Sequence, residues 1–325
     1  MNKLRGIDNE FAEVFKKSEL YTLYTEHPDE LFLGVRDNYL NLYYNCDSIA
    51  KVEYKKREEL ISCKIDRYFL DGNHYSKNKL VNLTPCEICN SYKDIKEHSD
   101  DIVKAKKDKK EKKAQSKLVI LNNQNKSSKW FCIDIEYANP KFRGRFDIIA
   151  ISKKKSHKES AHKVALIELK YGHDAIGGKS GIYEHVNNFI EFRKEGYYNK
   201  QMKQEIVSII KSLDNLGVEI PFTIPEESSI SNNSDFYFIT INNNAEKAGA
   251  DTPKQTMAAY LFTDKRWDCK ELSEKYNVQR DFKIDVTKKN NKFYATFLFS
   301  TQTLKDGITI NDIIDGNYNE RIIPE

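Results

Sequence analysis

The chain has 325 residues, of which 39% are hydrophobic and 31% charged, with a formal net charge of +4 at pH 7. That length is enough for one large domain or two ordinary ones, and 17 Phe and 19 Tyr can fill a core, which excludes disorder throughout. The small net charge does not by itself identify a nucleic-acid-binding protein. No apolar stretch is long enough to span a bilayer, no signal peptide is visible, and six scattered cysteines fit a reducing compartment, so we expect a cytoplasmic protein.

The first part of the chain is expected to form a β-rich accessory module over residues 1–88. Residues 9–26 carry apolar side chains at helical spacing, and from residue 31 the period changes to two. Turn-forming residues separate the alternating runs, which predicts an antiparallel meander over residues 29–70. A second domain is then expected over residues 89–325, with its core at about 90–242.

A lysine-rich stretch opens this second domain, with eight lysines between residues 104 and 117. Such a run is typical of a basic tail or linker. However, Ala114, Leu118 and Leu121 recur at helical spacing, and neither Gly nor Pro interrupts residues 91–126. One long helix with a solvated lysine face is therefore predicted. Glu111 would lie on the apolar stripe of this helix, where a carboxylate is rarely buried without a partner.

The remaining elements follow in a clear order, which predicts an α/β (α+β) domain. The expected strands and helices are, in chain order, strands 130–138, 146–152 and 163–171, helices 182–195 and 200–216, and a strand at 235–242. The tail adds strand-like runs at 258–263, 281–286 and 293–299.

A glycine-rich loop after the third strand contains Gly178, Lys179 and Ser180, as in a phosphate-binding loop of an ATPase. That motif also requires glycine at position 173, where the chain has His173. The strand before such a loop is expected to be uniformly apolar, yet two charged residues interrupt this one. The pattern therefore disfavours an ATPase.

The two charges are Glu168 and Lys170, which leave the same face of one strand because they are two residues apart. If residues 147–152 and 163–170 form a hairpin with its turn centred between 157 and 158, Asp147 lies opposite Glu168. A turn at residues 139–145 would likewise place Glu136 opposite Asp147. Three neighbouring carboxylates are costly without a cation, which indicates a divalent metal site.

This constellation resembles the PD-(D/E)XK nuclease superfamily, through Asp147 in RFDIIAI, Glu168-Leu169-Lys170 in IELK and the order of elements over residues 90–242. The proline that leads the motif is absent, since Phe146 precedes Asp147. The resemblance implies a restriction-endonuclease-like core, a central mixed sheet flanked by helices. It also implies that Asp147, Glu168 and the Leu169 carbonyl bind Mg²⁺ or Mn²⁺ and that Lys170 serves the attacking water.

Three further residues are candidates for the same site. Many members of the superfamily carry a glutamate on the helix before the first strand, and Glu111 fits that place. His185, on the helix after the IELK strand, and Glu136 are possible additional site residues.

The resemblance implies a Mg²⁺-dependent endonuclease that hydrolyses phosphodiester bonds, of DNA rather than RNA, with antiviral defence or restriction as its setting. The basic loop at 153–163 and the lysine-rich helix would contact phosphates. The N-terminal module would bind nucleic acid, a protein partner or a second copy. The alternative is a nucleic-acid-binding or assembly subunit on a nuclease-like fold, with weak or partner-gated cleavage.

Plainer readings stay open for each site residue. Glu168 and Lys170 fit an exposed cross-strand pair, and Asp147 fits a turn. Glu136 and His185 fit a solvated surface, and Glu111 fits an ion pair with a lysine of its own helix.

Cys86 and Cys89 have the spacing of a zinc knuckle, and a structural zinc site needs four ligands. Cys63 and His98 are available as the other two, but the chain has no second CxxC or HxxxH motif.

Overall fold

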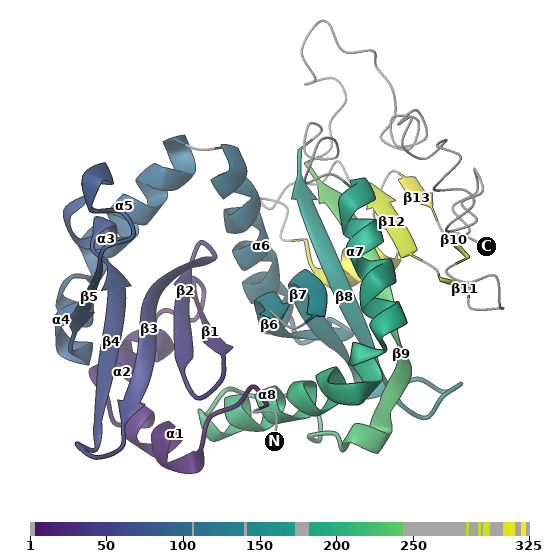
Figure 1. Cartoon of the computed structure of the whole chain (residues 1–325), viewed down its shortest axis with the longest axis horizontal. Coiled ribbons are helices and arrows are strands. Elements are labelled where there is room, and N and C mark those ends of the chain that lie inside the picture. The colour runs from purple at the N-terminus through teal and green to yellow at the C-terminus, as the bar shows by residue number, and fades with distance from the viewer. Residues whose placement is uncertain are drawn as a thin grey trace, which may run out of the picture.

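The computed structural model describes two β-sheets and the helices packed on them (Figure 1). The described residues are 4–105, 107–139, 142–172, 182–242, 284–285, 292–293, 295–299, 308–315 and 320–322. In the part of the chain that these ranges cover, no helix has both the length and the apolar character needed to cross a bilayer.

The first sheet is an antiparallel meander, as the sequence predicts for residues 29–70. Its strands occur in chain order across the sheet: β1 (Leu31–Val35), β2 (Leu40–Tyr44), β3 (Asp47–Lys55), β4 (Leu60–Asp66) and β5 (Leu80–Leu83). The helical pattern at 9–26 forms two helices, α1 (Asn9–Lys16) and α2 (Glu19–Glu26). The short helices after β4 are α3 (Tyr68–Asp71), the 3₁₀ turn η1 (His74–Ser76) and α4 (Pro85–Asn90). The domain boundary expected after residue 88 falls inside α4 and stays a prediction.

The prediction of one long helix over residues 91–126 is wrong, because the segment forms two helices, α5 (Tyr92–Ala105) and α6 (Lys107–Gln124). The Lys113 ammonium on α6 donates to Oδ1 of Asp100 on α5 over 2.9 Å. In one straight helix, residues 13 apart would be separated by roughly 20 Å. α5 and α6 must therefore fold toward each other to make this ion pair.

The second sheet is mixed and has the strand order β13-β12-β9-β8-β7-β6. Its strands are β6 (Trp130–Asn139), β7 (Phe142–Lys155), β8 (His162–Tyr171), β9 (Ile230–Ile241), β12 (Ala295–Phe299) and β13 (Glu320–Ile322). β8 pairs parallel with β9 and antiparallel with β7, so β8 is an interior strand with a neighbour on each side. The strands predicted at 130–138, 146–152, 163–171 and 235–242 are confirmed in kind. The first three extend beyond their predicted bounds, and the last begins five residues earlier and ends one residue earlier than predicted.

Helices cover both faces of this sheet. α7 (Ile182–Glu195) and α8 (Lys203–Asn215) pack on one face, through a cluster that includes Phe189, Ile206 and Leu166. α6 and α11 (Ile310–Asp315) pack on the other face, through a second cluster that includes Leu118 and Ile313. The chain is therefore mixed α/β, with an antiparallel sheet and a helix-covered mixed sheet.

Two predicted tail strands and one predicted helix differ in detail. The helix predicted from residue 200 begins with a π-helical turn, η4 (Tyr198–Met202), before α8. Of the tail runs, 281–286 contains β10 (Ile284–Asp285), and 293–299 contains part of β11 (Lys292–Phe293) and all of β12. Residues 258–263 lie outside the described residues.

A buried ion-pair network joins the two sheets. Asp134 of β6 is fully buried and accepts from Arg36, which follows β1, over 2.6 Å and from Arg5 over 2.8 Å. Arg36 also donates to the Ile135 carbonyl and to the Tyr43 hydroxyl, each over 2.8 Å. Because a buried charge without partners is costly, this network fixes where the first sheet meets the second.

Candidate functional site

Two charged side chains are buried at the carboxyl end of β8. The Glu168 and Lys170 side chains are 3% and 7% exposed, and the Lys170 ammonium donates to Glu168 Oε1 over 2.9 Å. The reading of these residues as an exposed cross-strand pair is therefore wrong. They alternate with Ile167 and Leu169, which pack toward α6 in the second cluster. A buried charged pair on a central strand is unusual enough to mark a site.

Asp147 lies on β7 beside this pair. The strands pair as Ile148↔Ile167 and Ile149↔Leu166, and one step further along the same register Asp147 stands across from Glu168, as the sequence predicts. The backbone ladder ends at Ile148, and the Asp147 carboxylate instead accepts the Leu169 N–H over 2.8 Å. The backbone of β8 therefore binds the Asp147 carboxylate, so Asp147 is not simply a residue of a solvated turn.

Glu111 reaches the same place from α6. Its Oε1 accepts from the Lys170 ammonium over 3.2 Å, and its Oε2 lies 3.4 Å from the Tyr171 backbone nitrogen, which donates to it. Its partner thus comes from the central strand and not from its own helix. The apolar stripe on which Glu111 lies explains why its partner is on β8, because that face of α6 packs on the sheet.

His185 completes the cluster from α7. Its Nε2 lies 3.0 Å from Glu168 Oε1, and its side chain is 20% exposed. Glu168 Oε1 therefore receives both Lys170 and His185. The reading of His185 as a plain surface residue is wrong.

Glu136 is close to this cluster, but its carboxylate is bound elsewhere. The register Ile135↔Ile148 and Tyr137↔Phe146 places Glu136 across from Asp147, as predicted. Its Oε1 pairs with Lys112 over 3.4 Å and its Oε2 with Arg145 over 2.9 Å. Glu136 also has a φ of 51°, which is rare for a residue other than glycine. Glu136 therefore ties α6 to the sheet, and both its oxygens face cations of the chain.

Burial and mutual charge shift the ionisation of the cluster. Burial, reinforced by the Glu168 charge, raises the pKa of Asp147 well above its usual value. Burial likewise raises the pKa of Glu111. Burial opposes ionisation of Glu168, but the hydrogen bond from His185 and the Lys170 charge outweigh it and lower the pKa of Glu168. Burial would lower the pKa of Lys170, yet the Glu168 and Glu111 charges raise it, so Lys170 is an ammonium at neutral pH.

The donor chemistry of the cluster fits a hard divalent cation. Asp147 and Glu168 each have one carboxylate oxygen, Oδ1 and Oε2, without a hydrogen-bond partner among the described residues. Carboxylate and carbonyl oxygens are the ligands that Mg²⁺ and Mn²⁺ prefer, and a cation would offset the cost of ionising Asp147. As it stands, no three His, Cys, Asp or Glu side chains within the described ranges are arranged as a metal-ligating group.

Two polar residues next to the site were not predicted. Gln115, one turn after Glu111 on α6, donates to the Asp147 carbonyl over 2.5 Å. Its spacing of four residues from Glu111, which places both side chains on one face of the helix, could have indicated it from the sequence. Thr240 of β9 pairs in register with Lys170, and its hydroxyl is buried without a hydrogen-bond partner in the described part of the chain. No pattern in the sequence distinguishes Thr240 from an ordinary strand residue.

The lysines of α6 are less available to phosphates than the sequence suggests. Lys109, Lys112 and Lys113 pair with Asp47, Glu136 and Asp100. Lys110 and Lys117 remain exposed on the same helix. The loop at 153–163 keeps exposed lysines, including Lys154 and Lys158.

The thiols that suggested zinc do not form a metal-ligating group with other described residues. Cys86 is exposed on α4, Cys89 is half-buried and Cys63 is buried. His98 is engaged through Nδ1 with the Phe69 carbonyl at 2.9 Å.

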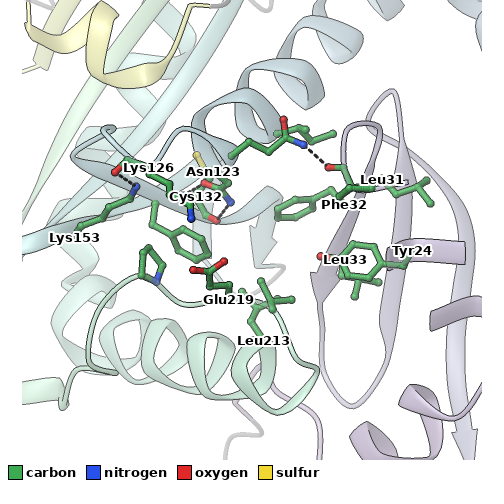
Figure 2. Close-up of a pocket in the computed structure, with 16 residues that line it drawn as sticks. Tyr24, Leu31, Phe32, Leu33, Asn123, Lys126, Cys132, Lys153, Leu213 and Glu219 are labelled. Atoms are coloured by element: carbon green, nitrogen blue, oxygen red, sulfur yellow. Dashed lines mark hydrogen bonds between the residues drawn. The ribbon is translucent and has the colours of Figure 1, made fainter. Parts of the chain in front are cut away.

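A cavity of about 520 Å³ lies apart from the charged cluster, between β1, the end of α6, the start of β6 and the segment after α8 (Figure 2). Figure 2 shows Phe32 of β1 and Cys132 of β6 among the residues that surround it. Both side chains are at least nine-tenths buried, and none of the candidate site residues lines this cavity.

Comparison of the chain with protein-family models, with curated proteins and with solved structures found no match. Any function proposed for it therefore depends on its own residues.

Proposed function

We propose that this protein is a metal-dependent nuclease of the PD-(D/E)XK type, which hydrolyses phosphodiester bonds of nucleic acid, of DNA in preference to RNA. The observation that carries the proposal is that Glu111 and Glu168 both accept from Lys170, while Asp147 on the neighbouring strand accepts the backbone N–H of Leu169, the residue between Glu168 and Lys170. The order of elements supports the same proposal, since α6 is followed by the antiparallel strands β6, β7 and β8, then by two helices, α7 and α8, and then by β9, which is parallel to β8.

Asp147, Glu168 and the Leu169 carbonyl would hold Mg²⁺ or Mn²⁺. When bound, the metal ion supplies an activated water and neutralises charge on the phosphate. Glu111 holds the Lys170 ammonium beside Glu168. Because the pKa of Lys170 is raised, we assign it the stabilisation of negative charge on the phosphate, and not the removal of a proton from water. His185 keeps Glu168 ionised and oriented.

A second candidate is a nucleic-acid-binding or assembly subunit whose cleavage is weak or gated by a partner. The observation that favours it is that Lys170 already bridges Glu111 and Glu168, so one positive charge of the chain occupies the cluster without a metal ion. In that case, binding of nucleic acid would be retained while cleavage is absent from the isolated chain.

Cleavage of plasmid DNA and of single-stranded RNA, with Mg²⁺ or Mn²⁺, separates the two candidates. Wild type should cut, and Lys170→Ala should not. If both proteins bind nucleic acid and neither cuts, the nuclease proposal is wrong and the binding subunit is favoured. Comparing the two substrates also decides between DNA and RNA.

A further inference from the structure

The turn between β2 and β3 has an unusual residue. Tyr44 pairs with Asp47, so only Asn45 and Cys46 form the loop, and their φ values are 51° and 59°. Two-residue hairpin loops with positive φ at both positions favour glycine at the second. A side chain at that position is disfavoured, and such residues persist where the surrounding structure needs them.

The Cys46 side chain packs into the second sheet's core. Cys46 is 2% exposed and belongs to the same apolar cluster as Ala114 and Leu118 of α6. The charges of Glu136 and Asp147 contribute, after burial, to the raised pKa of its thiol. The turn of the first sheet therefore lies against α6, beside the candidate site.

Charged groups fasten α6 to the same turn. The Lys109 ammonium donates to Asp47 Oδ1 over 2.5 Å, and Asp47 is 8% exposed. Asn45 donates to Asp100 Oδ1 over 3.0 Å, and Lys113 donates to the same oxygen over 2.9 Å. Lys109 and Lys113 flank Glu111 at two residues on either side.

Residues 109–115 of α6 also contact the candidate site. Glu111 accepts from Lys170, and Gln115 donates to the Asp147 carbonyl. Residues 109–115 of α6 are thus bound to the first sheet through Lys109 directly and through Lys113 by way of Asp100 of α5, and to the second sheet through Glu111 and Gln115. Figure 1 shows α6 running between the two sheets.

We propose that the β2–β3 turn is a positioning element of the candidate site, in which Asp47 holds Lys109 and so keeps Glu111 on Lys170. The first sheet is then a working part of the site and not a separable accessory. The claim that the turn supports catalysis rests on the proposed function, whereas the claim that the turn holds α6 in place does not.

Hydrogen exchange of α6 tests the hold without any need for activity. Asp47→Asn keeps the shape of the side chain and removes its charge. The matched control is Glu53→Gln, on the same strand, whose carboxylate pairs with Lys51 and Lys64 within the first sheet. We expect exchange over residues 109–115 to rise about tenfold in Asp47→Asn and to stay at the wild-type rate in Glu53→Gln. Equal exchange in the two variants would overturn the proposal.

Nucleic-acid cleavage by the same variants tests the claim that the turn supports catalysis. We expect kcat to fall about tenfold in Asp47→Asn with KM unchanged, to recover partly in Asp47→Glu, and to be unaffected in Glu53→Gln. Faster exchange with an unchanged kcat would overturn the positioning role and leave the nuclease proposal standing. If wild type does not cleave, the nuclease proposal fails, and the exchange of α6 alone decides whether the turn holds the helix.

Discussion

The Lys170 ammonium donates to Glu168 over 2.9 Å, although both side chains are buried and stand two residues apart on the central strand of the second sheet. Two opposite charges at this spacing share one face of the strand. Their burial is costly unless further partners compensate it. Glu111 accepts from Lys170, and His185 pairs with Glu168.

Replacing Lys170 with Met should reduce cleavage by about 10²–10³-fold, because the variant loses the positive charge that stabilises the phosphate in the transition state. The measurement is the initial rate of plasmid cleavage by protein shown to be folded. Lys211→Met is the control, since Lys211 is an exposed lysine of α8 and lies outside both the loop at 153–163 and the lysine-rich helix. A folded Lys170→Met protein that cuts at the wild-type rate would exclude this role.

Asp147→Asn should raise the melting temperature (Tm) at pH 8 by a few degrees. A gain of about 1 kcal/mol in the free energy of unfolding raises Tm by roughly 2–4 °C in large domains. The folded state raises the pKa of Asp147, so its ionisation costs stability. That cost is absent below the pKa of an unfolded aspartate, about 3.9, and grows as pH rises toward the folded pKa. The gain should therefore vanish near pH 3.5.

Thermal unfolding of both proteins across pH measures this difference. Asp101→Asn, an exposed residue of α5, is the control and should show no such trend. A gain that is the same at pH 3.5 and pH 8 would mean that the effect does not come from ionisation.

His185→Gln should move the ascending limb of the pH–rate profile to higher pH and reduce the rate at pH 7 by about 10–100-fold. The reason is that the hydrogen bond from His185 lowers the pKa of Glu168, so its loss raises that pKa. His157→Gln, in the exposed loop before β8, provides the comparison. An unshifted profile would remove His185 from the site.

Asp134→Ala should lower the free energy of unfolding by about 3–5 kcal/mol, because it leaves Arg36 buried without its carboxylate. Urea denaturation measures the change. Glu13→Gln removes an exposed ion pair with Lys16 and should cost less than about 1 kcal/mol. If the two variants lose equal stability, the junction between the sheets does not depend on this network.

The register of the β6–β7–β8 meander could be predicted from sequence because its hairpins are nearly symmetric about polar turns. Asp147 and Glu168 therefore lie where the count of residues placed them. Glu111 was found for a similar reason, since a carboxylate on an apolar helical stripe must meet a polar partner when the stripe is buried.

Other features leave no local signal. The break between α5 and α6 falls in a lysine run that favours helix throughout, and contacts with the first sheet explain the fold-back. The ion pair between Arg36 and Asp134 joins residues 98 apart, which no periodicity reveals. The binding of Glu136 by Lys112 and Arg145, in place of a metal ion, also depends on how α6 docks.

Mn²⁺ titration by isothermal calorimetry, with three proteins, tests the central claim most directly. Wild type should bind one Mn²⁺ per chain, Glu168→Gln should bind at least about tenfold more weakly, and Glu136→Gln should stay within about threefold of wild type. Absence of Mn²⁺ binding to the wild type, or equal binding by all three, would contradict the claim that Asp147 and Glu168 form a divalent-metal site beside Lys170.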